Sequence, residues 1–213
     1  MKHESVLIET VRVRRGAAPL WGLHLRRLFA SCAELGVPAP RELEVPGGGR
    51  DRVHRLSVGP RGIEVTERPV GSTSPPDLVT SRVMHRPYAH KTVERTAFDL
   101  ALAEAQRAGA DDGLLLTEGG YVGECAIWTM FWWDDAGELC TPALELGVLP
   151  GIARARIAEL TSLHERRVGR PALEGRPLFV ANAVRGIVEV RMLDGAAVPD
   201  SPRTDALRRR FWG

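Results

Sequence analysis

Lysine is almost absent from this chain. Of its 29 lysine and arginine residues, only Lys2 and Lys91 are lysines. Arginine stays protonated in proteins, whereas a lysine withdrawn from water can lose its proton and act as a nucleophile or a base. The composition therefore marks Lys91 as a candidate for chemistry. The alternative is a surface lysine in the first turn of a helix, although a positive charge there opposes the helix dipole.

Other scarcities narrow the class of protein. The chain has no apolar run of about 18 residues, the length that indicates a membrane span. Its opening segment reads as a strand and has no signal-peptide core. The net charge is only +2, which is too small to indicate a nucleic-acid partner. The three cysteines are odd in number and lack metal-ligand spacing, so we expect reduced thiols, no metal site and a cytoplasmic location.

The pattern of apolar and polar residues in the first part of the chain predicts a small sheet with one helix. Strands are expected at residues 6–13, 55–58, 62–70 and 78–84, and a helix at residues 23–35 with Gly36 as its stop. The expected buried stripe of that helix consists of Leu25, Leu28, Phe29 and Cys32. A polar stripe of His24, Arg27 and Ser31 runs beside it, and on pattern alone Arg27 could simply be a solvated helix residue.

The second part predicts a larger α/β unit. A loop at residues 85–90 precedes a helix at 92–107, whose buried stripe is Phe98, Ala101, Leu102 and Ala105. Two hairpins follow at residues 114–125 and 128–141, then a helix from Gly151, two late strands, and a last helix that Thr204 can cap. We therefore expect a small N-terminal α+β domain at residues 1–86 and a larger C-terminal α/β domain at residues 87–213.

Two further features add to Lys91. Glu124 is an isolated acid in an apolar, strand-like setting, and Leu149-Pro150-Gly151-Ile152 opens a helix. Three groups are needed to hold pyridoxal phosphate: a nucleophilic amine, a lone carboxylate, and the amide groups at the start of a helix. Each feature also has an ordinary interpretation, since strand glutamates often face water and Gly151 could merely begin a helix.

The order of these motifs is similar to that of the class IV aminotransferases, the fold-type IV pyridoxal-phosphate enzymes. The residues that carry the resemblance are Lys91-Thr92, Gly109-Ala110-Asp111-Asp112, Gly120-Tyr121-Val122-Gly123-Glu124, Thr141-Pro142 and Leu149 to Arg154. The resemblance implies a two-domain α/β (α+β) fold like that of D-amino acid aminotransferase. Family members usually have an opening strand and a glycine-rich turn before the segment that matches Ile8 to Val13. This sequence has no counterpart of these elements, so we expect a shortened N-terminal domain.

The resemblance also implies roles for individual residues. Lys91 would form the Schiff base, Glu124 would face the pyridine nitrogen, and Arg27 in the His24 to Leu28 element would bind phosphate. The other cofactor-binding positions would be Gly151, Ile152, Ala153, Thr129, Asn182 and Ala183. Tyr88 and Trp128 are weaker substrate candidates, because a core or interface role explains such aromatic residues equally well.

Three of these positions depart from the family pattern. Ala153 stands where threonine is usual, Ala183 where serine is common, and Thr129 where asparagine is usual. Two hydroxyl donors to phosphate are therefore missing, each worth about 0.5–1.5 kcal/mol net.

The activity implied is that of 4-amino-4-deoxychorismate lyase, which eliminates pyruvate and leaves 4-aminobenzoate. The alternatives are transamination of a branched-chain or D-amino acid, and a catalytically reduced relative that only binds the cofactor. In each case the resemblance implies a small-molecule ligand and a homodimer, with no nucleic acid or membrane partner.

Overall fold

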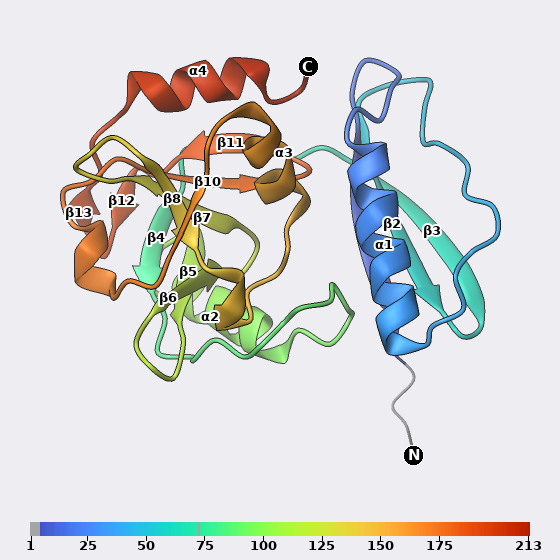
Figure 1. Ribbon diagram of the computed structural model, residues 1–213, viewed down its shortest axis with the longest axis horizontal. Helices are drawn as coiled ribbons and strands as arrows, with labels where there is room; N and C mark the ends of the chain where they lie inside the picture. The colour runs from blue at the N-terminus through green and yellow to red at the C-terminus, as the bar shows by residue number, and fades with distance from the viewer. Residues whose placement is uncertain (1–4, 72) are drawn as a thin grey trace. The chain divides into compact units, whose positions relative to one another are not determined.

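The computed structural model describes residues 5–71 and 73–213, which form two compact units (Figure 1). The first unit consists of the described residues of Met1–Ser72 together with His90–Glu94 and Trp212–Gly213. The second consists of Thr73–Ala89 and Arg95–Phe211. No helix in the described part of the chain is long and apolar enough to cross a membrane. The free cysteines Cys32, Cys125 and Cys140 are buried, as expected for reduced thiols.

The first unit is a three-stranded antiparallel sheet with one helix along a face (Figure 1). The strands are β1 (Leu7–Val13), β2 (Arg52–Gly59) and β3 (Gly62–Pro69), in that order across the sheet. The helix α1 (Trp21–Leu35) ends where Gly36 adopts φ 66°, a left-handed conformation that glycine enters without strain. Leu28 and Cys32 of α1 pack against Leu7 and Val58 of the sheet.

The helix α1 buries a different face from the one that its apolar pattern predicts. Phe29, expected in the core, is 40 % exposed, whereas His24 and Ser31 of the polar stripe are buried. The expectation for Phe29 was therefore wrong. Both polar side chains have partners on the buried face: His24 Nδ1 lies 2.6 Å from the carboxylate of Glu9 on β1, and Ser31 Oγ lies 3.0 Å from His90 Nδ1.

The second unit contains two five-stranded sheets (Figure 1). One sheet has the order β11-β10-β7-β8-β9 and the other β13-β12-β4-β5-β6. The first set comprises β7 (Thr129–Trp133), β8 (Leu139–Pro142), β9 (His164–Arg166), β10 (Leu178–Asn182) and β11 (Gly186–Glu189). The second set comprises β4 (Asp77–Thr80), β5 (Asp112–Leu116), β6 (Val122–Cys125), β12 (Met192–Leu193) and β13 (Ala196–Ala197). Side chains of both sheets share one apolar core, with Leu114 and Val122 from one and Trp132 and Val180 from the other.

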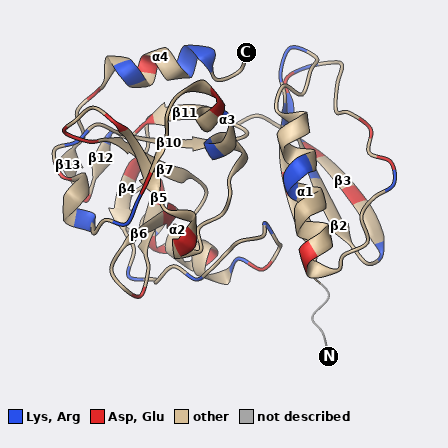
Figure 2. Cartoon of the chain, in the orientation of Figure 1, with Lys and Arg blue, Asp and Glu red and all other residues tan. Residues whose placement is uncertain are grey.

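Three helices accompany the sheets of the second unit: α2 (Thr96–Arg107), α3 (Ile152–Leu160) and α4 (Pro202–Arg210). Short 3-10 segments lie at η1 (Leu144–Leu146) and η2 (Arg170–Leu173). The two predicted hairpins are present as β5-β6 and β7-β8. Acidic and basic residues are interspersed along α4 (Figure 2), and Arg208, Arg209 and Arg210 are exposed, as a solvated helix face requires.

Two predicted boundaries were wrong. The helix α2 begins at Thr96 rather than residue 92, because residues 91–93 pair with β1 instead: Ile8 N–H donates to Lys91 O at 2.8 Å, and Leu7 bridges Thr92. Lys91 therefore lies in extended chain, and the helix-dipole argument does not apply to it. The strand β4 ends at Thr80 and pairs with β5, so residues 73–86 group with the second unit rather than with the expected N-terminal domain.

The start of α4 also differs from the prediction. Ser201 occupies the N-cap position, while Thr204 is buried in the first turn. The Thr204 hydroxyl accepts a hydrogen bond from Trp133 Nε1 at 3.0 Å. The threonine thus ties the last helix to β7 instead of capping it, because a buried indole N–H requires an acceptor.

Candidate functional site

Glu124 is a buried carboxylate whose two oxygens have different surroundings. It lies on β6 and its residue is 6 % exposed, so the water-facing interpretation of this strand glutamate is wrong. Oε1 accepts a hydrogen bond from Leu149 N–H at 2.9 Å and lies 3.1 Å from His85 Nε2. Oε2 accepts none from the described residues. A buried anion with one unbonded oxygen can serve as partner for a cationic N–H group.

The strand β6 admits His85 beside Glu124 because the preceding residue is a glycine. A Cβ on Gly123 would lie 2.9 Å from Leu115 O and 3.2 Å from His85 Cγ. Any side chain at Gly123 would therefore force either the strand pairing or the histidine ring to move. No motif had pointed to His85, since it lies in the segment predicted only as a loop.

The start of α3 is a buried helix N-terminus without a cap. Gly151 occupies the N-cap position, and no side chain in the described part of the chain caps the first turn. Ile152, Ala153 and Arg154 are buried, and no acceptor among the described residues bonds to their N–H groups. Buried helix starts normally satisfy these donors. An anion such as a phosphate group would do so here, aided by the helix dipole.

Thr129 lies beside this helix start. Its Oγ1 is 3.0 Å from the point where a Cβ on Gly151 would be, so glycine permits the close approach of the hydroxyl. The Thr129 residue is 9 % exposed, and its hydroxyl forms no hydrogen bond with the described residues. One hydroxyl is thus present at the helix start although Ala153 and Ala183 provide none.

The loop after β10 is closed by Asn182 itself. Its Oδ1 accepts hydrogen bonds from Val184 N–H at 3.0 Å and Arg185 N–H at 2.8 Å, and its Nδ2 donates to Ile127 O at 3.3 Å. The Asn182 side chain is therefore engaged in shaping the turn. Ala183, inside the turn, contributes only backbone groups to any ligand.

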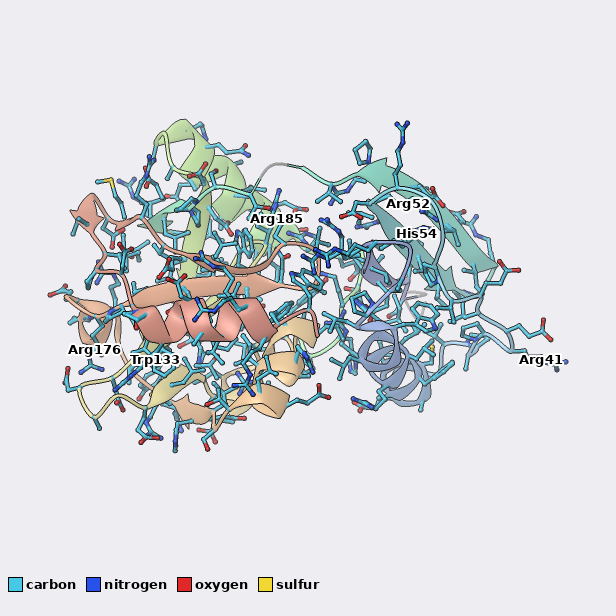
Figure 3. The ribbon with its side chains drawn as sticks, turned by 90° about the horizontal axis from the view of Figure 1, so that it is seen from above. Arg41, Arg52, His54, Trp133, Arg176 and Arg185 are labelled. Atoms are coloured by element: carbon cyan, nitrogen blue, oxygen red, sulfur yellow. The ribbon has the colours of Figure 1, made fainter. Side chains whose placement is uncertain are left out.

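The two aromatic candidates pack within the second unit. Trp128 is a buried member of the core, and the Arg185 guanidinium, labelled in Figure 3, lies 5.3 Å from its ring centroid. Tyr88 packs its ring 4.9 Å from that of Phe98, and its N–H donates to Gly147 O at 2.7 Å. These contacts explain both aromatic residues by packing, while their roles toward a substrate stay predictions.

Arg27 belongs to the first unit, where it pairs with an acid that the sequence reading overlooked. Its Nε and Nη2 lie 2.8 and 2.6 Å from the two carboxylate oxygens of Glu9, and His24 Nδ1 is 2.6 Å from Glu9 Oε2. Burial alone would raise the pKa of Glu9, but the Arg27 charge and the hydrogen bonds of both partners lower it to about 2. Strand alternation could have predicted that Glu9 is buried, because Glu9 lies on the same inward face of β1 as Val11 and Val13.

Lys91 lies in the same unit, close to this cluster. Burial lowers the pKa of His24, the Glu9 carboxylate opposes that change, and the nearby charges of Arg27 and Lys91 lower it further. Lys91 is held by its backbone in the bridge to β1. The first unit therefore brings Lys91 and Arg27 into one neighbourhood, and the second unit contains Glu124, Thr129 and the α3 start. That all of them serve one cofactor stays a prediction.

The fold is that of known class IV enzymes. The structure of branched-chain amino acid aminotransferase from Escherichia coli matches with a TM-score of 0.84 at 21 % identity, covering 100 % of this chain and 85 % of that one. An amino-acid aminotransferase candidate from Mesorhizobium loti matches with a TM-score of 0.81 at 27 % identity, covering 88 % and 99 %. A candidate 4-amino-4-deoxychorismate lyase from Legionella pneumophila matches with a TM-score of 0.82 at 25 % identity, covering 96 % and 89 %.

Sequence comparison assigns the family. Residues 63–193, more than half of the chain, match the profile of amino-transferase class IV. The chain therefore belongs to the class IV aminotransferase family, whose members are pyridoxal-phosphate-dependent aminotransferases and lyases. A stretch of 120 residues is 32 % identical to the branched-chain-amino-acid aminotransferase of Escherichia coli strain K12. That match spans 52 % of this chain and only 38 % of the length of the relative.

The residues of the second unit fit the cofactor of this family. Pyridoxal phosphate carries a phosphate group and a ring nitrogen that can be protonated. The uncapped start of α3 and the unbonded Thr129 hydroxyl suit the phosphate, and Glu124 Oε2 suits the protonated ring nitrogen. The predicted family and fold class are thus confirmed, while the individual residue roles remain to be tested.

Proposed function

We propose that this chain is a pyridoxal-phosphate-dependent enzyme in which Lys91 supplies the amine that binds the aldehyde of the cofactor. Glu124 would face the ring nitrogen, and the α3 amides with Thr129 would bind the phosphate. The observation that carries this proposal is the Glu124 carboxylate. It is buried, it bonds to other described residues only through Oε1, and it lies on the strand that the family motif predicts.

The residues divide the chemistry between them. When bound, pyridoxal phosphate accepts the electrons released as a bond breaks at the amino-bearing carbon of the substrate. The negative charge of Glu124 favours the protonated ring, which is the stronger electron acceptor. With substrate bound, the Lys91 amine would be able to move a proton at the substrate Cα or beyond it. Arg27 is oriented by its two contacts with Glu9.

Within this class we favour elimination of pyruvate from 4-amino-4-deoxychorismate. The sequence around His90-Lys91-Thr92 with Arg95, and the turn Asn182-Ala183-Val184-Arg185-Gly186, resemble the lyase branch. The similarity to the Legionella pneumophila lyase candidate extends over 96 % of this chain and supports the same activity.

Transamination is the second candidate. It is favoured by the 32 % identity with the Escherichia coli aminotransferase and by the similarity to the Mesorhizobium loti structure. A relative that binds the cofactor without catalysis is the third, and the absence of hydroxyl groups at Ala153 and Ala183 favours it. The homodimer expected from the resemblance stays a prediction, which sedimentation of the purified protein would test.

One assay separates these activities. The protein with pyridoxal phosphate is incubated with 4-amino-4-deoxychorismate, and separately with branched-chain and D-amino acids, each with and without an α-keto acid. Release of pyruvate and 4-aminobenzoate without the keto acid would support the lyase, and turnover only with the keto acid would replace it by the transaminase. Lys91→Ala should lower either activity by at least about 10²–10⁴-fold, the usual contribution of an acid–base group. A Lys91→Ala variant with undiminished activity would contradict the proposal.

A further inference from the structure

His85 is the one side chain that contacts the Glu124 carboxylate among the described residues. Its side chain is 1 % exposed, and its Nε2 lies 3.1 Å from Glu124 Oε1. The ring is fixed on several sides. His85 N–H donates to Leu116 O at 2.7 Å, the ring meets Phe98 edge-on at 5.8 Å and 77°, and Gly123 leaves room for it. These contacts fix which ring nitrogen of His85 faces Glu124.

The hydrogen bonding selects one form of His85. Its Nδ1 is buried and has no hydrogen-bond partner among the described residues. An imidazolium would bury an unpaired N–H there, and the Nδ1–H tautomer would do the same while turning the Nε2 lone pair toward a carboxylate. The neutral Nε2–H tautomer avoids both penalties, since it leaves only a lone pair without a partner. His85 thus donates to Glu124 without adding a positive charge.

We infer that His85 is a positioning residue for Glu124: as a neutral donor it holds Oε1, and so directs Oε2 and the full negative charge toward the ring nitrogen of the cofactor. This inference rests on the proposed function. Arg154 is a charged group whose pKa responds to Glu124, and its guanidinium lies 2.7 Å from its own partner Glu165. Burial raises the pKa of the adjacent Cys125 thiol well above its usual value, so that thiol adds no charge.

Two substitutions separate donation from packing. His85→Phe retains an aromatic ring but removes the donor, whereas His85→Gln retains an N–H donor. His164→Phe is the matched control, because His164 also lies beside an acid, Glu138, but is 36 % exposed on the surface. Each variant is reconstituted with pyridoxal phosphate, and its dissociation constant and the pH dependence of its visible absorbance are measured, with the melting temperature of the cofactor-free protein as a check on folding.

The expected results follow from the loss of one hydrogen bond to a charged group. In His85→Phe the dissociation constant should rise by about tenfold or more. The pH midpoint of the absorbance change should move by about one unit, because Glu124 would be held less firmly toward the ring nitrogen and would stabilise a proton there less well. His85→Gln should restore both values to near the wild type, and His164→Phe should change neither.

A measurement without cofactor tests the same inference on the wild type. Nitrogen chemical shifts of the His85 imidazole should show the neutral Nε2–H tautomer at pH 7. An imidazolium or the Nδ1–H tautomer would overturn the inference, as would a folded His85→Phe variant with the wild-type pH midpoint. If the wild type instead shows no absorbance band that borohydride removes, the proposed function fails and the positioning role fails with it.

Discussion

Two buried glutamates in the described part of the chain, Glu9 and Glu124, have opposite electrostatic surroundings. In the first unit, Glu9 is contacted through both oxygens by the Arg27 guanidinium and by His24. In the second unit, the only hydrogen-bond partners of Glu124 among the described residues are the Leu149 N–H and the imidazole of His85, both at Oε1. Burial is similar, at 3 % exposure for Glu9 and 6 % for Glu124. Burial alone therefore does not distinguish the roles of the two glutamates, whereas the charges of their hydrogen-bond partners do.

The difference assigns a role to each carboxylate. A buried acid that is neutralised by a cation has little charge left for a ligand, and removing it leaves the cation uncompensated. A buried acid that is held by neutral donors keeps its negative charge. Because a buried charge is costly unless it is paired, a cationic group of a bound ligand would stabilise it. We therefore expect Glu9 to matter chiefly for stability and Glu124 chiefly for cofactor binding and activity.

The largest expected effect is on stability, from Glu9→Gln. The substitution removes the carboxylate that the partly buried Arg27 guanidinium contacts, which should lower the free energy of unfolding by about 3–5 kcal/mol. Urea unfolding would measure this change. Glu34→Gln is the control on α1, the helix that carries Arg27, since Glu34 is 68 % exposed beside His90 and its loss should cost at most about 1 kcal/mol. Equal losses in the two variants would remove the distinction between buried and exposed acids.

The next effect is a loss of stability in acid. The pKa of Glu9 is about 2 in the folded chain against 4.5 for an ordinary glutamate, so its contribution is present above pH 4.5 and is lost as the pH falls through 2. The difference of 2.5 units corresponds to about 3 kcal/mol. His24, whose pKa is lowered by burial, adds a loss that begins below its usual pKa of 6.5. Unfolding free energies of wild type and Glu9→Gln should therefore converge as the pH approaches 2, and parallel curves would contradict this account.

Glu124→Gln should weaken cofactor binding but have little effect on stability, the reverse of what is expected for Glu9→Gln. Because a hydrogen bond between charged groups is worth about 1.5–3 kcal/mol, loss of the negative charge should weaken cofactor binding by about 10- to 100-fold. The cofactor-free protein should keep most of its stability, since no cation is left unpaired. Titration with pyridoxal phosphate, followed by absorbance, would measure the affinity. If Glu124→Gln instead unfolds like Glu9→Gln and binds the cofactor normally, the roles assigned to the two acids are wrong.

The smallest expected effect is that of Thr129→Val. The variant keeps the shape of the side chain beside Gly151 but removes its hydroxyl. One hydrogen bond to phosphate is worth about 0.5–1.5 kcal/mol, so the affinity for pyridoxal phosphate should fall by roughly 2- to 10-fold. Inorganic phosphate, used as a competitor, should lose affinity by the same factor. An unchanged affinity for both would place the phosphate away from Thr129.

The sequence predicted local features of the second unit well. Strand alternation and turn residues located both hairpins, and Gly151 located the start of α3. These features depend on patterns among residues that are close together in the sequence. Glu124 was singled out because an acid in an apolar strand is costly unless something compensates it.

The overlooked features all depend on partners that are distant in sequence. His85 reaches Glu124 across 39 residues, and no periodic pattern marks a loop histidine as buried. The β1 strand draws residues 91–93 away from α2, because backbone pairing with Leu7 and Ile8 replaces the first helical turn. The buried polar face of α1 could have been predicted only by pairing its stripe with Glu9 on the neighbouring strand.

The scarcity of lysine provides the most direct test of the central claim. Wild-type protein is incubated with pyridoxal phosphate, reduced with borohydride and digested, and the modified peptides are identified by mass. Reduction should fix the cofactor on the peptide that contains Lys91 and leave Lys2 unmodified. A cofactor mass on Lys2 or on the amino terminus alone, or no adduct at all, would contradict the proposal that Lys91 binds the cofactor.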